Sequence, residues 1–84
     1  MQNVTKEKKT SNAAEERQLK KDKVRLERQM EKAHTRIVEL EKEQESAAFD
    51  ANRLQAIGEE LVRTRLEKDK LEEEWLQVTL SLES

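Results

Sequence analysis

Five cations are the residues whose spacing first suggests chemistry. Arg17, Lys21, Arg25, Arg28 and Lys32 follow one another at intervals of 4, 4, 3 and 4 residues. Such intervals place side chains on one face of an α-helix, and no acid shares that face. A row of cations suits the phosphate backbone of a nucleic acid, without selecting a base sequence. We expect these five to be nucleic-acid-binding residues, although the same pattern also describes a solvated charged face.

The remaining reactive residue types lack the partners that catalysis or metal binding requires. His34 is the single histidine and the chain has no cysteine, so no metal site is expected. Glu72, Glu73 and Glu74 are consecutive, so they point in different directions around a helix and do not form a catalytic pair. Trp75 could stack on a base, but its heptad position favours packing between helices. The sequence therefore predicts a domain that is not an enzyme.

The composition favours helices with a narrow apolar contact. The 84 residues are 33% hydrophobic and 43% charged, with one glycine and no proline. Such a chain forms at most one small domain and lacks the usual residues of tight β-turns. No apolar run has the length of a membrane span and no signal-peptide core is present, so we expect a cytoplasmic protein. Residues 1–36 carry a net charge of +5 and residues 37–84 a net charge of −7, which favours a hairpin that pairs the two halves.

Two heptad patterns divide the chain. The first consists of Leu19, Leu26, Ala33, Leu40 and Ala47, with Lys23, Met30, Ile37 and Gln44 at the complementary positions. The second consists of Leu54, Ile57, Leu61, Thr64, Lys68, Leu71, Trp75, Val78 and Leu82. The phase breaks between Ala47 and Leu54, which predicts a turn there, although a stutter in one long rod also shifts the phase.

The patterns together predict an all-α fold, a two-helix antiparallel coiled-coil hairpin. We expect a flexible basic linker at residues 1–11 and the hairpin at 12–84, with helices at about 12–47 and 51–82 and a turn at about 48–50. Asn12 and Asp50 are the expected helix caps. Positions whose numbers sum to about 101 should face each other, which pairs Leu40 with Leu61, Ile37 with Thr64, Met30 with Leu71, Leu26 with Trp75 and Leu19 with Leu82. Because each hairpin buries its own apolar contact, we expect a monomer.

A second apolar line lies off the predicted contact of the second helix. Val62, Leu66, Leu76 and Leu80 share this line and are candidate partner-docking residues, although scattered apolar residues are also common on protein surfaces. Gly58 lies inside the second helix, where glycine is unfavourable by about 1 kcal/mol relative to alanine. Either a close helix approach or a local irregularity would account for it.

Three segments resemble a known family. They are the start Leu26-Glu27-Arg28-Gln29, the turn Ala-Ala-x-Asp-x-x-Arg-Leu from Ala47 to Leu54, and the end Leu71-Glu72-Glu73-Glu74-Trp75-Leu76. Together they resemble the C-terminal coiled-coil domain of the ABC-F class, including its Uup-like branch, over roughly two thirds of the chain. Proteins of this class carry two ATP-binding cassettes and no membrane domain.

The resemblance implies a hairpin that follows the second cassette and binds duplex or branched DNA or the ribosome. The phosphate-binding loop of an ATPase is absent here. ATP and Mg²⁺ are therefore expected only in the cassettes of the parent protein, and this domain should hold no cofactor. The apolar line would then dock on those cassettes. The alternative is a structural coiled coil without nucleic-acid binding, such as a parallel homodimer of long rods that serves for spacing or dimerisation.

Overall fold

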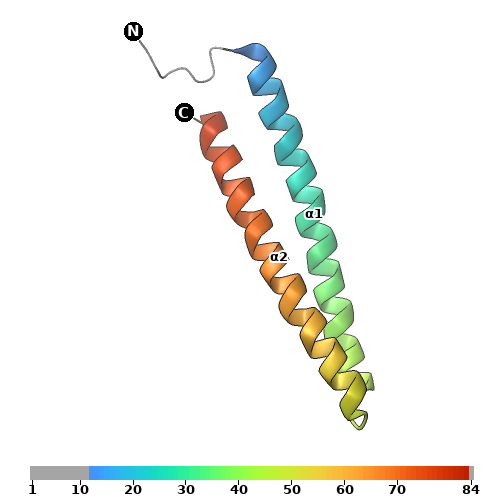
Figure 1. Cartoon of the computed structure of the whole chain (residues 1–84). Helices are drawn as coiled ribbons and strands as arrows, with labels where there is room; N and C mark the ends of the chain where they lie inside the picture. The colour runs from blue at the N-terminus through green and yellow to red at the C-terminus, as the bar shows by residue number, and fades with distance from the viewer. Residues whose placement is uncertain (1–11, 84) are drawn as a thin grey trace.

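The computed structural model describes residues 12–83 and confirms the all-α hairpin. Helix α1 (Ala13–Ser46) and helix α2 (Ala51–Glu83) run antiparallel and pack along their lengths (Figure 1). The parallel rod is therefore wrong for this chain. The expected basic linker at 1–11 lies outside the described residues. Neither helix within residues 12–83 is both long and apolar enough to cross a membrane.

Side-chain caps start both helices. The Asn12 side-chain oxygen accepts hydrogen bonds from the amides of Ala14 (2.9 Å) and Glu15 (3.2 Å). Asp50 does the same for α2, because its carboxylate accepts from the Arg53 amide at 3.1 Å. These bonds satisfy amides that a helix start otherwise leaves without a partner. Both caps agree with the sequence expectation.

The turn between the helices forms without glycine or proline. Ala47 is the C-cap residue of α1 and has φ −98°. Its backbone amide donates a hydrogen bond to the carbonyl oxygen of Glu43 at 2.9 Å. The Asp50 amide then donates to Ala47 O at 2.9 Å, which closes the turn just before α2 begins. Because φ at Ala47 is negative, no left-handed residue is needed at this position.

The two heptad lines meet as a narrow apolar core, the seam. Leu26 and Leu40 are fully buried, and Ile57 and Leu61 are nearly so. Near the turn the core is continuous, with a cluster formed by Leu40, Ala47, Ile57 and Leu61. Toward the open end of the hairpin several seam residues are only half-buried, and these are Leu19, Trp75, Val78 and Leu82. The hairpin is therefore held most firmly between Leu26 and the turn.

Polar contacts between the helices agree with the expected register. Arg36 bonds Glu60 and Glu41 bonds Arg65, and the residue numbers of the two pairs add to 96 and 106, evenly spaced about 101. Near the open end the Trp75 indole N–H donates to Glu27 at 3.0 Å. The two ion pairs lie on either side of the seam, where charged residues of coiled coils usually pair.

One seam position was predicted incorrectly. Gln44 is exposed, although the heptad pattern places it on the seam. The neighbouring contacts are made by an apolar cluster that includes Leu40 and Ala47. A glutamine amide buried there would lose its hydration without gaining a partner, so it remains in water.

Gly58 is not explained by a close approach of the helices. A methyl group added at this position would meet no atom within 4 Å. Gly58→Ala should therefore raise the free energy of unfolding by about 0.5–1 kcal/mol, because alanine restricts the unfolded chain and favours helix. Urea unfolding followed by helical circular dichroism measures the change. A decrease in stability would show that the glycine is needed for the packing of α2.

Candidate nucleic-acid interface

The five expected nucleic-acid-binding residues form one row along the outer edge of α1. Arg17, Lys21, Arg25, Arg28 and Lys32 are all exposed. At 100° per residue they cover a strip about 80° wide, centred about 150° away from the seam. At the helical rise of 1.5 Å the row is about 22 Å long, the length of roughly six phosphates on one strand of a duplex. We name this row the basic stripe.

Four of the five cations have no carboxylate within ion-pair distance among residues 12–83. The exception is Arg25, whose guanidinium lies 3.8 Å from Asp22 and 3.4 Å from the side-chain oxygen of Gln29. Asp22 lies just off the stripe, and its i,i+3 spacing to Arg25 was a signal for this pair in the sequence. Exposed pairs at this distance are worth at most about 1 kcal/mol, so a phosphate can compete for Arg25.

The structure adds two residues to this edge that the spacing of the cations did not identify. A shallow hollow of about 440 Å³ lies along it, lined by Lys20, Lys21, Val24, Arg25 and Arg28. The Lys20 ammonium lies 3.5 Å from Glu16, and Val24 is 47% exposed between the cations. Lys20 could have been assigned to this edge from the sequence, because it directly precedes Lys21 and widens the positive edge by one residue.

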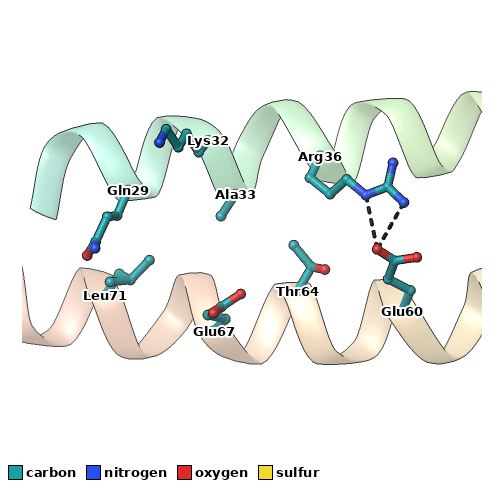
Figure 2. Close-up of a pocket in the computed structure, with 8 residues that line it drawn as sticks. All are labelled: Gln29, Lys32, Ala33, Arg36, Glu60, Thr64, Glu67 and Leu71. Carbon is teal, nitrogen blue, oxygen red and sulfur yellow. Dashed lines mark hydrogen bonds and ion pairs between the residues drawn. The ribbon is translucent and has the colours of Figure 1, made fainter.

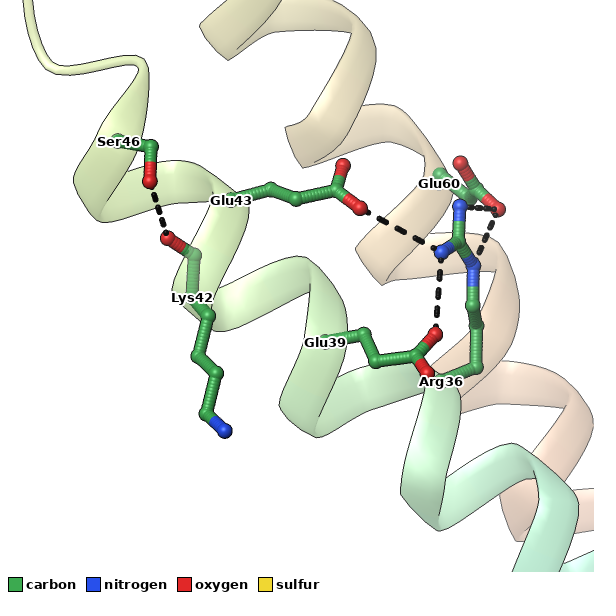
Figure 3. Close-up of polar contacts among 6 residues, drawn as sticks. All are labelled: Arg36, Glu39, Lys42, Glu43, Ser46 and Glu60. Carbon is green, nitrogen blue, oxygen red and sulfur yellow. Dashed lines mark hydrogen bonds and ion pairs between the residues drawn. The ribbon is translucent and has the colours of Figure 1, made fainter.

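The stripe ends at Lys32 because the next basic residue turns toward α2. The Arg36 guanidinium donates two hydrogen bonds to one oxygen of Glu60, at 2.9 and 3.0 Å (Figure 3). The same guanidinium lies 3.4 Å from Glu39 and 3.6 Å from Glu43. The hydrogen bond to Glu60 and the nearby carboxylates raise the pKa of Arg36 above its ordinary value. Three acids thus surround Arg36 and mark the boundary of the positive edge.

Known proteins give no further information about this interface. Comparisons with protein-family models, curated proteins and solved structures find no match for this chain. The interface therefore has to be judged from its own residues.

A second hollow lies between the helices where the seam side chains are small. Ala33 of α1 and Thr64 of α2 both line it, and its volume is about 400 Å³ (Figure 2). Lys32 and Glu67 lie at its edges, and the Arg36–Glu60 pair closes one end. The hollow is open and shallow, as expected where two small side chains meet on a seam. Within the described part of the chain, no group of His, Asp or Glu side chains is arranged to hold a metal ion.

The four candidate docking residues lie on the outer edge of α2. Val62, Leu66, Leu76 and Leu80 are between 48% and 59% exposed. Their line lies about 150° from the seam of α2, so they face away from α1. The basic stripe and this apolar line therefore occupy opposite edges of the hairpin.

Proposed function

We propose that this hairpin is a non-catalytic nucleic-acid-binding appendage that contacts backbone phosphates of duplex DNA or of ribosomal RNA. The observation that carries the proposal is the basic stripe, a row of exposed cations on the edge opposite the seam. Nothing in the packing of the hairpin requires five cations there, because the interhelical ion pairs use Arg36 and Arg65 instead. Phosphate contacts would give affinity without sequence preference.

The attachment to a soluble, cytoplasmic ABC-F ATPase rests on the sequence resemblance alone. If it holds, the cassettes hydrolyse ATP and the hairpin supplies a second contact to the bound nucleic acid. The isolated chain should then bind weakly, because its net charge is −2 and its stripe is short. Useful affinity would come from the linked cassettes, through the higher effective concentration that linkage gives.

A charge-matched comparison tests the proposal. The stripe variant Lys21→Gln/Arg25→Gln/Arg28→Gln removes three cations and keeps helix propensity. The control variant Lys42→Gln/Arg63→Gln/Lys70→Gln removes three exposed cations from outside the stripe. Lys68 is unsuitable as a control because its ammonium bonds Glu72 at 2.7 Å.

Binding to a labelled DNA duplex is measured by fluorescence anisotropy over a range of low salt concentrations. The stripe variant should bind several-fold more weakly, and the slope of log K against log salt should fall by about one unit for each phosphate that the variant no longer neutralises. The control variant should change the affinity less and keep the slope. Equal weakening by both variants, or no binding by the wild-type chain to duplex DNA or to ribosomes, would reduce the stripe to a solvated charged face.

A further inference from the structure

The outer edge of α2 repeats the spacing of a coiled-coil seam. Starting at Val62, intervals of 4, 3, 4, 3 and 4 residues lead through Leu66, Asp69, Glu73 and Leu76 to Leu80. The four apolar members are 57%, 59%, 48% and 50% exposed in chain order, so about half of each side chain remains open to solvent. At 1.5 Å per residue this outer line is about 27 Å long. Two apolar i,i+4 pairs on one face distinguish it from single surface apolar residues, which are common.

The middle of the outer line is acidic. Asp69 and Glu73 are exposed between the two apolar pairs, and neither makes an ion pair with another residue of 12–83. The nearby Lys68 is not available to them, because its ammonium bonds Glu72 at 2.7 Å, and Lys70 borders the same hollow as Glu73 without forming an ion pair among residues 12–83. The line therefore has two apolar ends and a negative centre.

This charge arrangement disfavours a second copy of α2 as the occupant. Antiparallel pairing that sets Val62 against Leu80 also sets Asp69 against Glu73 of the other copy. Parallel pairing in register sets each acid against itself. Both arrangements bring like charges together across a contact, which is destabilising.

The outer edge of α1 in a second copy is also a poor occupant. The two outer edges lie on opposite sides of the hairpin, so such a contact is heterologous and leaves both remaining edges open to further copies. Heterologous contacts that do not close into a ring produce filaments.

We infer that the outer line of α2 binds an amphipathic helix in a segment of another protein. This helix has apolar residues at both ends and lysine or arginine at its centre. A helix of about three heptads would match the length of the line. Its cations would face Asp69 and Glu73, and its apolar ends would cover the two apolar pairs. This site goes beyond nucleic-acid binding and lies on the opposite edge from the basic stripe, so the two edges can be occupied together.

Two synthetic helices test the inference. Both are fluorescein-labelled, about three heptads long, and carry leucine at the outer seam positions. One has lysine at the two central seam positions and the other has glutamate there. The wild-type chain should bind the lysine-centred helix about tenfold more tightly than the glutamate-centred helix by fluorescence anisotropy.

Variants then locate the site. Leu66→Gln/Leu76→Gln should abolish binding, whereas Val24→Gln/Val38→Gln, which changes exposed valines on α1, should leave it intact. Asp69→Lys/Glu73→Lys should reverse the preference between the two helices, which keeps the test decisive even if the first variant unfolds. Circular dichroism identifies any variant that has unfolded.

Three results would overturn the inference. They are no binding of either helix, equal binding of both, or equally weakened binding in the α1 and α2 variants. Sedimentation equilibrium of the chain alone addresses self-association. A dimer that Leu66→Gln/Leu76→Gln dissociates would assign the outer line to a second copy instead, whereas a monomer at all concentrations supports the inference.

Discussion

Leu40→Ala is expected to lower the free energy of unfolding by about 3 kcal/mol. Leu40 is fully buried in the cluster with Ala47, Ile57 and Leu61, so truncation leaves a cavity at the tightest part of the seam. A chain of this size rarely gains more than about 3–5 kcal/mol from its core. The variant should therefore be largely unfolded at 25 °C, as measured by circular dichroism and urea titration.

The matched control is Leu66→Ala, the same substitution on the same fold at a residue that is 59% exposed. It should change the free energy of unfolding by less than about 0.5 kcal/mol. Similar decreases at both positions would mean that the hairpin is not held by the seam described here, and a parallel dimer through another face would have to be considered.

Position on the seam could be predicted from the sequence, but depth of burial could not. Heptad spacing identified Leu26 and Leu40, and the change of phase after Ala47 located the turn, because both depend only on helical geometry. Gln44 shares that spacing but remains in water. Its amide needs hydrogen-bond partners that an apolar cluster cannot provide, and spacing carries no information about partners.

The interhelical ion pairs also could not be predicted from the sequence. The chain is 43% charged, so a cation beside the seam can have several acids within reach along its own helix and across the seam. Arg36 has three acidic neighbours. It donates two hydrogen bonds to Glu60 because of its side-chain rotamer, which the sequence pattern does not determine. Arg36 follows Lys32 by four residues, so by spacing alone it could equally have been the next member of the basic stripe.

The face of the basic stripe follows from spacing, whereas its function does not. Exposed cations satisfy the same geometry whether they meet phosphates or water. Only the position of the stripe, on the edge that the hairpin contact does not use, separates it from the structural cations Arg36 and Arg65. That is why the test of the proposed function compares two variants of equal charge and not the presence of binding alone.

Trp75→Ala is expected to lower the free energy of unfolding by about 1–3 kcal/mol, below the value typical of a fully buried tryptophan. The indole is half-buried on the seam near the open end of the hairpin. Its N–H donates to Glu27 at 3.0 Å, and the Lys23 ammonium lies 5.8 Å from the ring centroid. The substitution removes the packed ring, the hydrogen bond and the cation–π contact together.

Trp75→Phe separates these contributions. Phenylalanine keeps an apolar ring on the seam and removes the donor to Glu27, so this variant should be destabilised by only about 1 kcal/mol. Circular dichroism during urea unfolding measures both variants, because neither retains tryptophan fluorescence. In the wild-type chain, the emission of Trp75 should shift to longer wavelength on unfolding, and acrylamide should quench the folded state only in part.

The neighbouring Leu76→Ala is the control, because Leu76 is 48% exposed on the outer line and its truncation should cost less than about 0.5 kcal/mol. If Trp75→Ala is no more destabilising than Leu76→Ala, or if the folded indole is quenched as readily as free tryptophan, Trp75 does not hold the open end of the hairpin. An exposed indole near Lys23 would then become a candidate for stacking on a base, and the nucleic-acid interface would extend beyond the basic stripe.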